Sequence, residues 1–390
     1  PGGLSFLRLH PALAIRHAGG QLFQEAHFEL LRVSPNFDLF GLMDAPETRV
    51  DNRGGTHFTP PALARSIVEQ VLASLPDLAS RQQLTICDPA CGSGAFLHEA
   101  LRALRRAGFN GQLKLVGMDV SLAAISMARF VLSLSARDWK PAGGVELQLI
   151  HGDSLGEAGM PAADAIVMNP PFIAFGAQTA LQRQQLRDAT DAGATRGDYS
   201  MAFIARALDA LTPGGVLGSL FPASLLSLKA AATWRERLAA EGDVRMLASI
   251  GDFGLFSHAM VQVACAVVRK GRPSGPSTLM AVLTENDPAA TGEALRQIRK
   301  LNGATPTAPI IETNWSLFPI LSDSLTKRPT WRLPTPATER LLTDLGELSL
   351  PIVQDLFEVS QGIQTGLNDT LLLAEDEWRA LPAKERRYFR

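Results

Sequence analysis

The stretch Leu84-Thr-Ile-Cys-Asp-Pro-Ala-Cys-Gly-Ser-Gly94 decides the fold of this chain. Its apolar first part, Leu84–Cys87, predicts a strand, and a glycine turn then opens a helix over about 94–107. Gly92 and Gly94 let the backbone approach a ligand closely, and the helix N-terminus supplies free N–H groups. The turn matches neither the P-loop pattern nor the dinucleotide pattern G-x-G-x-x-G. It therefore predicts a strand–turn–helix unit of another kind, whose turn faces a ligand.

Short apolar runs alternate with amphipathic segments on the C-terminal side of this unit. The alternation requires crossover connections and predicts an α/β fold with a doubly wound, mostly parallel, seven-stranded sheet. About ten residues without a clear helix join the last two strands, which makes them antiparallel neighbours. The expected strands are Leu84–Cys87, Leu113–Met118, Val145–Ile150, Ala165–Met168, Gly215–Phe221, Val244–Ile250 and Val261–Val268, and the expected helices lie at about 94–107, 121–135, 199–211 and 223–240.

Changes in composition divide the chain into four segments. Residues 1–54 predict a helical or irregular N-terminal cap, and 55–270 form the α/β domain. Within that domain, Thr59 is placed to cap a helix that carries proline in its first turn. Residues 271–277, rich in Gly, Pro and Ser, indicate a linker, and 278–390 predict a second, irregular domain.

Composition and charge narrow the class of protein. The 390 residues are 46% hydrophobic and 19% charged, enough apolar material for a sizeable core. A net charge of −2 excludes a uniformly basic nucleic-acid coat, so any phosphate-binding surface must be local. Cys87, Cys91 and Cys265 have neither a disulfide framework nor zinc spacing, so we expect a reducing cytoplasm and no metal site. No apolar run approaches the roughly 20 residues that cross a bilayer, so no membrane partner is expected.

Acidic residues follow two further strands. Asp119 ends the next strand, where a carboxylate is placed to accept both hydroxyls of a ribose. Asp153 follows the third strand and could accept from an exocyclic adenine amine. Because the carboxyl ends of parallel strands meet at one edge, the ordered series describes a site for an adenosine-containing cofactor.

The segment Asn169-Pro170-Pro171-Phe172 ends the fourth strand and carries the chemistry. Proline lacks an N–H group and fixes φ, so the Pro170 carbonyl cannot swing freely. The Asn169 side-chain oxygen and that carbonyl form two rigid acceptors, and Phe172 offers a flat face beside them. This combination suits an exocyclic amine that donates two hydrogen bonds while its ring is stacked.

These motifs, in this order, resemble those of amino-group DNA methyltransferases. The resemblance covers about residues 50–270 and includes Gly55-Thr-His-Phe-Thr-Pro60, Gly197-Asp-Tyr-Ser-Met-Ala-Phe203 and Phe221-Pro222. It implies a Rossmann-like class I methyltransferase fold and S-adenosyl-L-methionine as cofactor. The cofactor-binding residues that it indicates, together with their neighbours in the turns, are Phe58, Thr59, Asp88, Ala90, Gly92, Gly94, Asp119, Val120, Asp153, Ser154 and Asn169.

The resemblance also implies the catalytic and DNA-contacting residues. The catalytic set is Asn169, Pro170, Pro171 and Phe172, with Phe172 stacked on the substrate base. Phe256, just before the last expected strand, matches a second stacking aromatic. Arg183 and Arg187 follow the catalytic loop in a polar, glutamine-rich stretch and are candidates for contacts to DNA.

Motif order narrows the class to the gamma group, which includes type I modification subunits and type IIG enzymes. Only 15 residues separate Asp153 from Asn169, too few for an inserted recognition domain, so recognition must follow Lys270. Val359–Asn368 resembles the element that opens many gamma-group recognition regions. Because the chain begins at Pro1 and ends at Arg390, we expect a piece of a longer protein in which 278–390 is the start of a target-recognition domain.

The expected reaction is methyl transfer from S-adenosylmethionine to N6 of an adenine flipped out of double-stranded DNA, in a bacterial restriction-modification or phage-defence system. A specificity or restriction subunit, or further domains, are the expected protein partners. Asn169 favours N6 of adenine as the target, because the members of the family that methylate N4 of cytosine usually carry Ser at the corresponding position. Three alternatives stay open: a protein glutamine-N5 methyltransferase, an RNA guanine-N2 methyltransferase, and a non-catalytic DNA-binding subunit of the same fold.

Overall fold

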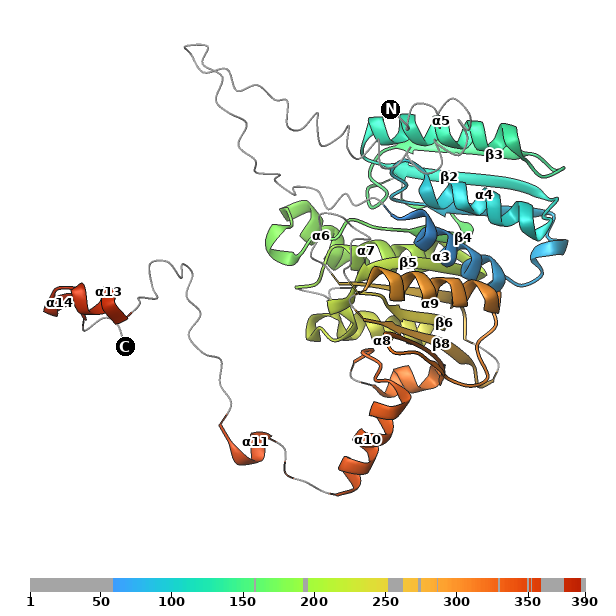
Figure 1. Cartoon of the computed structure of the whole chain (residues 1–390). Coiled ribbons are helices and arrows are strands. Elements are labelled where there is room, and N and C mark those ends of the chain that lie inside the picture. Colours follow the sequence, from blue (N-terminus) through green and yellow to red (C-terminus); the bar gives the residue numbers. More distant parts are fainter. Residues whose placement is uncertain are drawn as a thin grey trace, which may run out of the picture. The chain divides into compact units, whose positions relative to one another are not determined.

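The computed structural model describes residues 59–157, 159–191, 196–251, 262–272, 275–285, 287–328, 330–348, 351, 353–358 and 375–386 (Figure 1). The chain divides into two units between Pro336 and Ala337. The first carries the sheet. Within the described residues, no helix is long and apolar enough to span a membrane.

The described strands form one sheet in the order β3-β2-β1-β4-β5-β7-β6-β8-β10-β9. Strands β3, β2, β1, β4 and β5 pair in parallel, whereas β7 is antiparallel to both β5 and β6. The predicted doubly wound, mostly parallel sheet with an antiparallel last strand is thereby confirmed. The strands are β1 Gln83–Asp88, β2 Gln112–Asp119, β3 Val145–His151, β4 Ala163–Met168, β5 Leu211–Pro222, β6 Gly242–Ser249, β7 Val263–Lys270, β8 Thr278–Thr284, β9 Ile310–Ile311 and β10 Trp315–Leu321.

Helices cover both faces of the sheet and create two apolar cores (Figure 1). Helices α3, α4, α5 and α9 pack on one face, and α6, α7 and α8 pack on the other. The strand residues alternate between the cores, as in Ile86 on one side and Cys87 on the other. The helices of the first unit are α3 Pro61–Ser74, α4 Ala95–Ala107, α5 Leu122–Asp138, α6 Ala180–Ala189, α7 Ser200–Ala210, α8 Ala232–Glu241 and α9 Pro288–Leu301.

Two glycines set the packing and the length of helices near the site. At Gly218 in β5, a Cβ atom would lie 2.4 Å from Val71 Cγ2 and 2.8 Å from Ile67 Cγ2, so α3 needs glycine there to sit close to the sheet. Helix α4 ends at Gly108, whose φ of +68° belongs to the left-handed region, and its N–H bonds back to the Arg105 carbonyl. Gly218 thus lets α3 lie close to β5, and Gly108 ends α4.

The sheet does not stop at the segment predicted as a linker. Strand β8 pairs in parallel with β6 directly after residues 271–277, and β10 and β9 extend the edge further. The buried polar contact between Ser277 Oγ and Asp243 Oδ1, at 2.7 Å, anchors this turn. The sheet therefore continues beyond residue 270, and the described residues form ten strands where seven were expected. The glycines and prolines marked a turn, and the apolar run of β8 completed the sheet.

Two further expectations differ from the structure or lie outside it. The N-cap of α3 is Pro60, without a side-chain hydrogen bond, so Thr59 does not cap the helix, although Pro61 does occupy its first turn. Residues 1–54 and 359–368 lie outside the described residues. The remaining helices are α10 Pro336–Glu347, α11 Val353–Leu356, α13 Glu375–Ala380 and α14 Ala383–Arg386.

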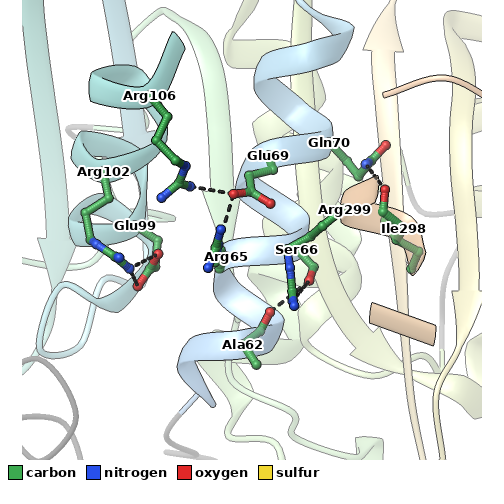
Figure 2. Close-up of polar contacts among 10 residues, drawn as sticks. All are labelled: Ala62, Arg65, Ser66, Glu69, Gln70, Glu99, Arg102, Arg106, Ile298 and Arg299. Atoms are coloured by element: carbon green, nitrogen blue, oxygen red, sulfur yellow. Dashed lines mark hydrogen bonds and ion pairs between the residues drawn. The ribbon is translucent and has the colours of Figure 1, made fainter. Parts of the chain in front are cut away.

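Polar side chains join α3, α4 and α9 on the outer side of their core (Figure 2). Glu69 of α3 accepts hydrogen bonds from Arg65 at 2.9 Å and from Arg106 of α4 at 2.5 Å. In α4, Arg102 Nη1 contacts both Glu99 oxygens at 2.9 Å. Contacts from α3 to α9 complete the set: Gln70 donates to the Ile298 carbonyl, and Arg299 donates to Ser66 Oγ. We call these residues the helix-face network.

Candidate active site

The residues predicted to form the site lie at one edge of the sheet. Because β3, β2, β1 and β4 are parallel, their carboxyl ends point the same way (Figure 1). Asp88 and Asp119 end β1 and β2, Asp153 lies two residues after β3, and Asn169 directly follows β4. Four strands thus deliver three carboxylates and one amide to the same edge.

The turn after β1 is tied to the end of β2. The backbone N–H of Cys91 donates to the Met118 carbonyl at 2.9 Å, and the N–H of Gly92 donates to Asp119 Oδ2 at 2.9 Å. The other oxygen of Asp119 accepts from the N–H of Ser121 at 2.8 Å, at the start of α5. Asp119 therefore holds both turns in place, and each of its oxygens keeps lone pairs for a ligand.

Glycine at position 92 leaves a space above this turn. Its φ of +50° favours glycine, and a Cβ built there would meet no described atom within 4 Å. The same holds for a Cβ at Gly152, after β3. Gly94 differs, because its Cβ would lie in ordinary contact with Ala128 at 3.4 Å, and its φ of +86° is what favours glycine there. The open positions are those nearest the strand ends.

Asp88 is the most deeply buried carboxylate of the site, with a 1% exposed side chain. One of its oxygens accepts from the N–H of Ala90 at 3.1 Å. Among the described residues, no arginine or lysine forms an ion pair with it. Burial raises its pKa well above the ordinary aspartate value; the Ala90 hydrogen bond opposes this, and the charge of Asp119 adds to it. A cation placed here would be favoured electrostatically.

The donor set fits S-adenosylmethionine. Asp88 would accept the cationic methionine end of such a molecule, and Asp119 would accept its ribose hydroxyls. Val120 follows Asp119 with 70% of its surface exposed, an apolar surface suited to a base, and Ser154 is buried beside Asp153. The spaces at Gly92 and Gly152 give such a molecule room.

Asp153 is held by a side chain, Gln185, that the sequence did not point out, and Tyr199 holds Gln185 in turn. Its Oδ1 accepts from the N–H of Leu155 at 2.9 Å, and its Oδ2 accepts from Gln185 Nε2 of α6 at 2.7 Å. Tyr199 donates its hydroxyl to Gln185 Oε1 at 2.5 Å. Gln185 lay in the glutamine-rich stretch and Tyr199 in the Gly197-Asp-Tyr motif, but nothing in the sequence joined them to Asp153.

Asn169 makes the contact that displaces Thr59 from its predicted role as a helix cap. Its Nδ2 donates to Thr59 Oγ1 at 3.1 Å. This bond directs the amide nitrogen toward the start of α3 and the amide oxygen the other way. Pro170 is buried, and Phe172 is half-buried against the core that α3 and α4 cover. The loop therefore presents its acceptors from a rigid base.

The exit of the catalytic loop is clamped at Ile173, the residue after Phe172. The Ile173 carbonyl accepts from the N–H of Tyr199 at 3.0 Å and from Gln178 Nε2 at 2.8 Å. Gln178 Nε2, buried, also donates to the Gly197 carbonyl at 2.9 Å. The segment before α7 thus holds the loop that carries Phe172.

Of the residues predicted to contact DNA, the structure describes Arg183, Arg187 and Phe172 but not Phe256. Arg183 stacks over Phe175, with its Cζ 4.8 Å from the ring centroid. Arg187 is exposed and donates to Gln184 Oε1 at 2.5 Å. Phe58 and Phe256 lie outside the described residues. The roles of Arg183 and Arg187 remain predictions.

Cys87 and Cys91 lie beside the site but are buried. Burial, together with the charge of Asp88, raises the pKa of both thiols far above the usual range. Both thiols therefore stay protonated at neutral pH, and a thiol is a poor nucleophile. This agrees with a site that needs no covalent intermediate.

The strand order and the residues at the carboxyl edge define a class I methyltransferase fold. The chain belongs to the N-6 DNA Methylase family, whose model matches residues 42–303. This extends past the boundary that we predicted at 270 and includes β8 and α9.

The chain also resembles individual methyltransferases. It is 27% identical over 354 residues to the type II methyltransferase M.BanIII of Aneurinibacillus aneurinilyticus. This alignment covers 84% of this chain and 59% of M.BanIII. The type IIG restriction endonuclease BpuSI has a TM-score of 0.56 at 17% identity, over 96% of this chain and 48% of that one. A type I methyltransferase subunit from Streptococcus thermophilus has a TM-score of 0.51 at 18% identity, over 69% of this chain and 56% of that one. The two structures share the fold.

Proposed function

We propose that this chain transfers a methyl group from S-adenosylmethionine to N6 of adenine in double-stranded DNA, as the methyltransferase part of a bacterial restriction-modification enzyme. The observation that carries the proposal is the Asn169 amide, fixed by Thr59 and followed by buried Pro170, at the edge where Asp88, Asp119 and Asp153 lie. Family membership and the M.BanIII resemblance support it.

The reaction needs a nucleophilic amine, and the amine of adenine is a poor one because its lone pair is delocalised into the ring. S-adenosylmethionine supplies the methyl group on a sulfonium centre, which leaves as a neutral thioether. Asn169 Oδ1 and Pro170 O accept the two N–H groups, favour a pyramidal nitrogen and stabilise its developing positive charge. In such a transfer the N–CH3 bond would form as the S–CH3 bond breaks, and the amine would then lose one proton to solvent.

The substrate base must leave the duplex, because N6 is paired within it. Phe172 is half-buried and follows the two acceptors after one further proline, so it could stack on the flipped base and recover part of the unstacking cost. The chain spans 59% of the length of the curated relative it matches. Further domains or a specificity subunit would then complete target recognition, and a bacterial cytoplasm is the expected location.

The test is transfer of labelled methyl groups to mixed genomic DNA, followed by separation of the nucleosides. Asn169→Ala should lower the label in N6-methyladenine by a factor on the order of 10²–10³, because one preorganised acceptor is lost. Binding of S-adenosylhomocysteine, measured by calorimetry, should stay close to that of the unchanged chain. Arg105→Ala, on the exposed side of α4, is the control and should leave both unchanged.

Near-normal transfer by the Asn169→Ala variant would refute the mechanism. Label found in N4-methylcytosine, and not in N6-methyladenine, would show that the substrate base is cytosine instead of adenine. Label in protein or RNA, with none in DNA, would favour the glutamine-N5 or guanine-N2 alternatives.

A further inference from the structure

We infer that Gln185 is a positioning residue that makes the cofactor site selective for a 6-amino purine, by holding the Asp153 carboxylate as a hydrogen-bond acceptor. The inference rests on the proposed function, because it concerns the adenine of the methyl donor. It adds two residues, Gln185 and Tyr199, that act on the cofactor through Asp153.

Three side chains from separate segments form the chain of contacts. Tyr199, 5% exposed at the start of α7, donates to Gln185 Oε1 at 2.5 Å. Gln185, half-buried in α6, donates from Nε2 to Asp153 Oδ2 at 2.7 Å. Neither partner is adjacent to Asp153 in the sequence, and the contacts depend on α6 packing against α7 and the end of β3.

The direction of these hydrogen bonds follows from their chemistry. Burial, and then the charge of Asp153, raises the pKa of Tyr199 far above its usual range, so its hydroxyl carries a proton and donates. An amide oxygen only accepts, so Oε1 faces Tyr199 and the NH2 group faces Asp153. Tyr199 thus fixes which end of the Gln185 amide meets the carboxylate.

Two donors then address the Asp153 carboxylate, one on each oxygen. Leu155 N–H donates to Oδ1 and Gln185 Nε2 donates to Oδ2, so the two bonds hold both carboxylate oxygens in place as acceptors. Each oxygen keeps a second lone pair, which an exocyclic amine can use. A 6-oxo purine would present an oxygen instead, and two acceptors facing each other repel.

Without Gln185, the Asp153 carboxylate loses one of the two hydrogen bonds that fix its orientation. The Asp153 carboxylate could then rotate about its side-chain bonds and no longer present an acceptor at a fixed position to the purine 6-substituent. Discrimination against the 6-oxo purine should therefore fall further than affinity for the adenine ligand. If Gln185 had a purely structural role, its loss would weaken the binding of both ligands by the same factor.

The experiment is calorimetric binding of S-adenosylhomocysteine and its 6-oxo analogue, S-inosylhomocysteine, to the full chain. We expect the unchanged chain to prefer the adenosyl ligand. Gln185→Leu, which keeps the volume without donors, should reduce the affinity ratio by about tenfold, and Tyr199→Phe by about threefold. Gln184→Ala is the matched control, because Gln184 is the exposed neighbour on the same helix and contacts Asp188 and Arg187.

The inference is overturned if neither Gln185→Leu nor Tyr199→Phe alters the ratio of the two affinities. It is also overturned if the chain without substitutions binds the two ligands equally. If Gln185→Leu fails to fold, Tyr199→Phe alone decides. An unchanged chain that binds neither ligand refutes the proposed function itself. Failure of the inference and failure of the proposed function are therefore distinguishable.

Discussion

Two buried carboxylates, Asp88 at the end of β1 and Glu99 in the following helix α4, have opposite surroundings. Glu99, 2% exposed, lies against the guanidinium of Arg102, which contacts both of its oxygens. Asp88, 1% exposed, accepts a backbone N–H from Ala90, and the described part of the chain places no arginine or lysine beside it. Burial raises its pKa, and the nearby Asp119 adds to the rise.

The difference separates structural charges from functional ones. A buried carboxylate with a guanidinium partner is compensated within the chain, and removing the partner destabilises the fold. A buried carboxylate without such a partner opposes folding when ionised, and it is tolerated where a ligand supplies the cation. The helix-face network of Figure 2 belongs to the first kind and the carboxyl edge of the sheet to the second. Changes at the edge should affect binding and transfer, and changes in the network should affect stability.

The strongest test of this separation is Asp88→Asn. The substitution removes the carboxylate that we propose to face the ammonium group of the ligand, so affinity for S-adenosylhomocysteine should fall by about 30-fold or more. The melting temperature of the ligand-free variant should equal or exceed that of the unchanged chain at neutral pH. Calorimetry and thermal melting measure the two effects.

The sign of the pH dependence follows from the raised pKa. The folded chain holds a proton on Asp88 at pH values where the unfolded chain has lost it, so this group makes folding less favourable as pH rises between the two pKa values. A cation favours the ionised form, so binding releases a proton and the affinity of the unchanged chain should increase with pH in that range. Asp88→Asn should lose this dependence. A variant that melts lower and keeps its affinity would contradict the assignment of Asp88 to the second kind.

The opposite result is expected for Arg102→Ala. Losing the guanidinium beside buried Glu99 should destabilise the ligand-free chain by about 2–3 kcal/mol, less than a fully buried pair because 27% of the Arg102 side chain is exposed. Affinity for S-adenosylhomocysteine should not change, which calorimetry below the melting temperature measures. Arg105→Ala is the control, because Arg105 and its partner Asp138 are both exposed and such pairs contribute little. Equal melting temperatures for Arg102→Ala and Arg105→Ala would contradict the assignment of the Glu99–Arg102 pair to the structural charges.

The sequence predicted most of the edge but little of its support. Asp88, Asp119 and Asp153 follow apolar runs, and parallel pairing alone brings such strand ends together. The Gln185–Asp153 contact spans 32 residues and depends on how α6 docks, which local periodicity does not encode. Thr59 was misjudged for a similar reason, since a hydroxyl before a helix normally suggests a cap, but here it accepts from Asn169.

Helix α3 joins the two regions and gives the finest test of where one ends. Thr59 precedes the helix and contacts Asn169, whereas Glu69, further along, belongs to the helix-face network. Thr59→Val keeps the shape but removes the acceptor of the Asn169 amide, so single-turnover methyl transfer should slow by about five- to tenfold, the loss of one ordinary hydrogen bond. Thr59→Ser restores the acceptor and should restore the rate.

Glu69→Gln, on the same helix, should leave the transfer rate unchanged and lower the melting temperature slightly at low salt. Glu69 lies between Arg65 and Arg106, and neutralising it leaves the two guanidinium groups to repel each other through solvent that salt screens. If Thr59→Val instead lowered stability and left the rate unchanged, the start of α3 would belong to the helix face. The catalytic amide would then be oriented by the proline loop alone, and the separation between the two regions would begin at Asn169.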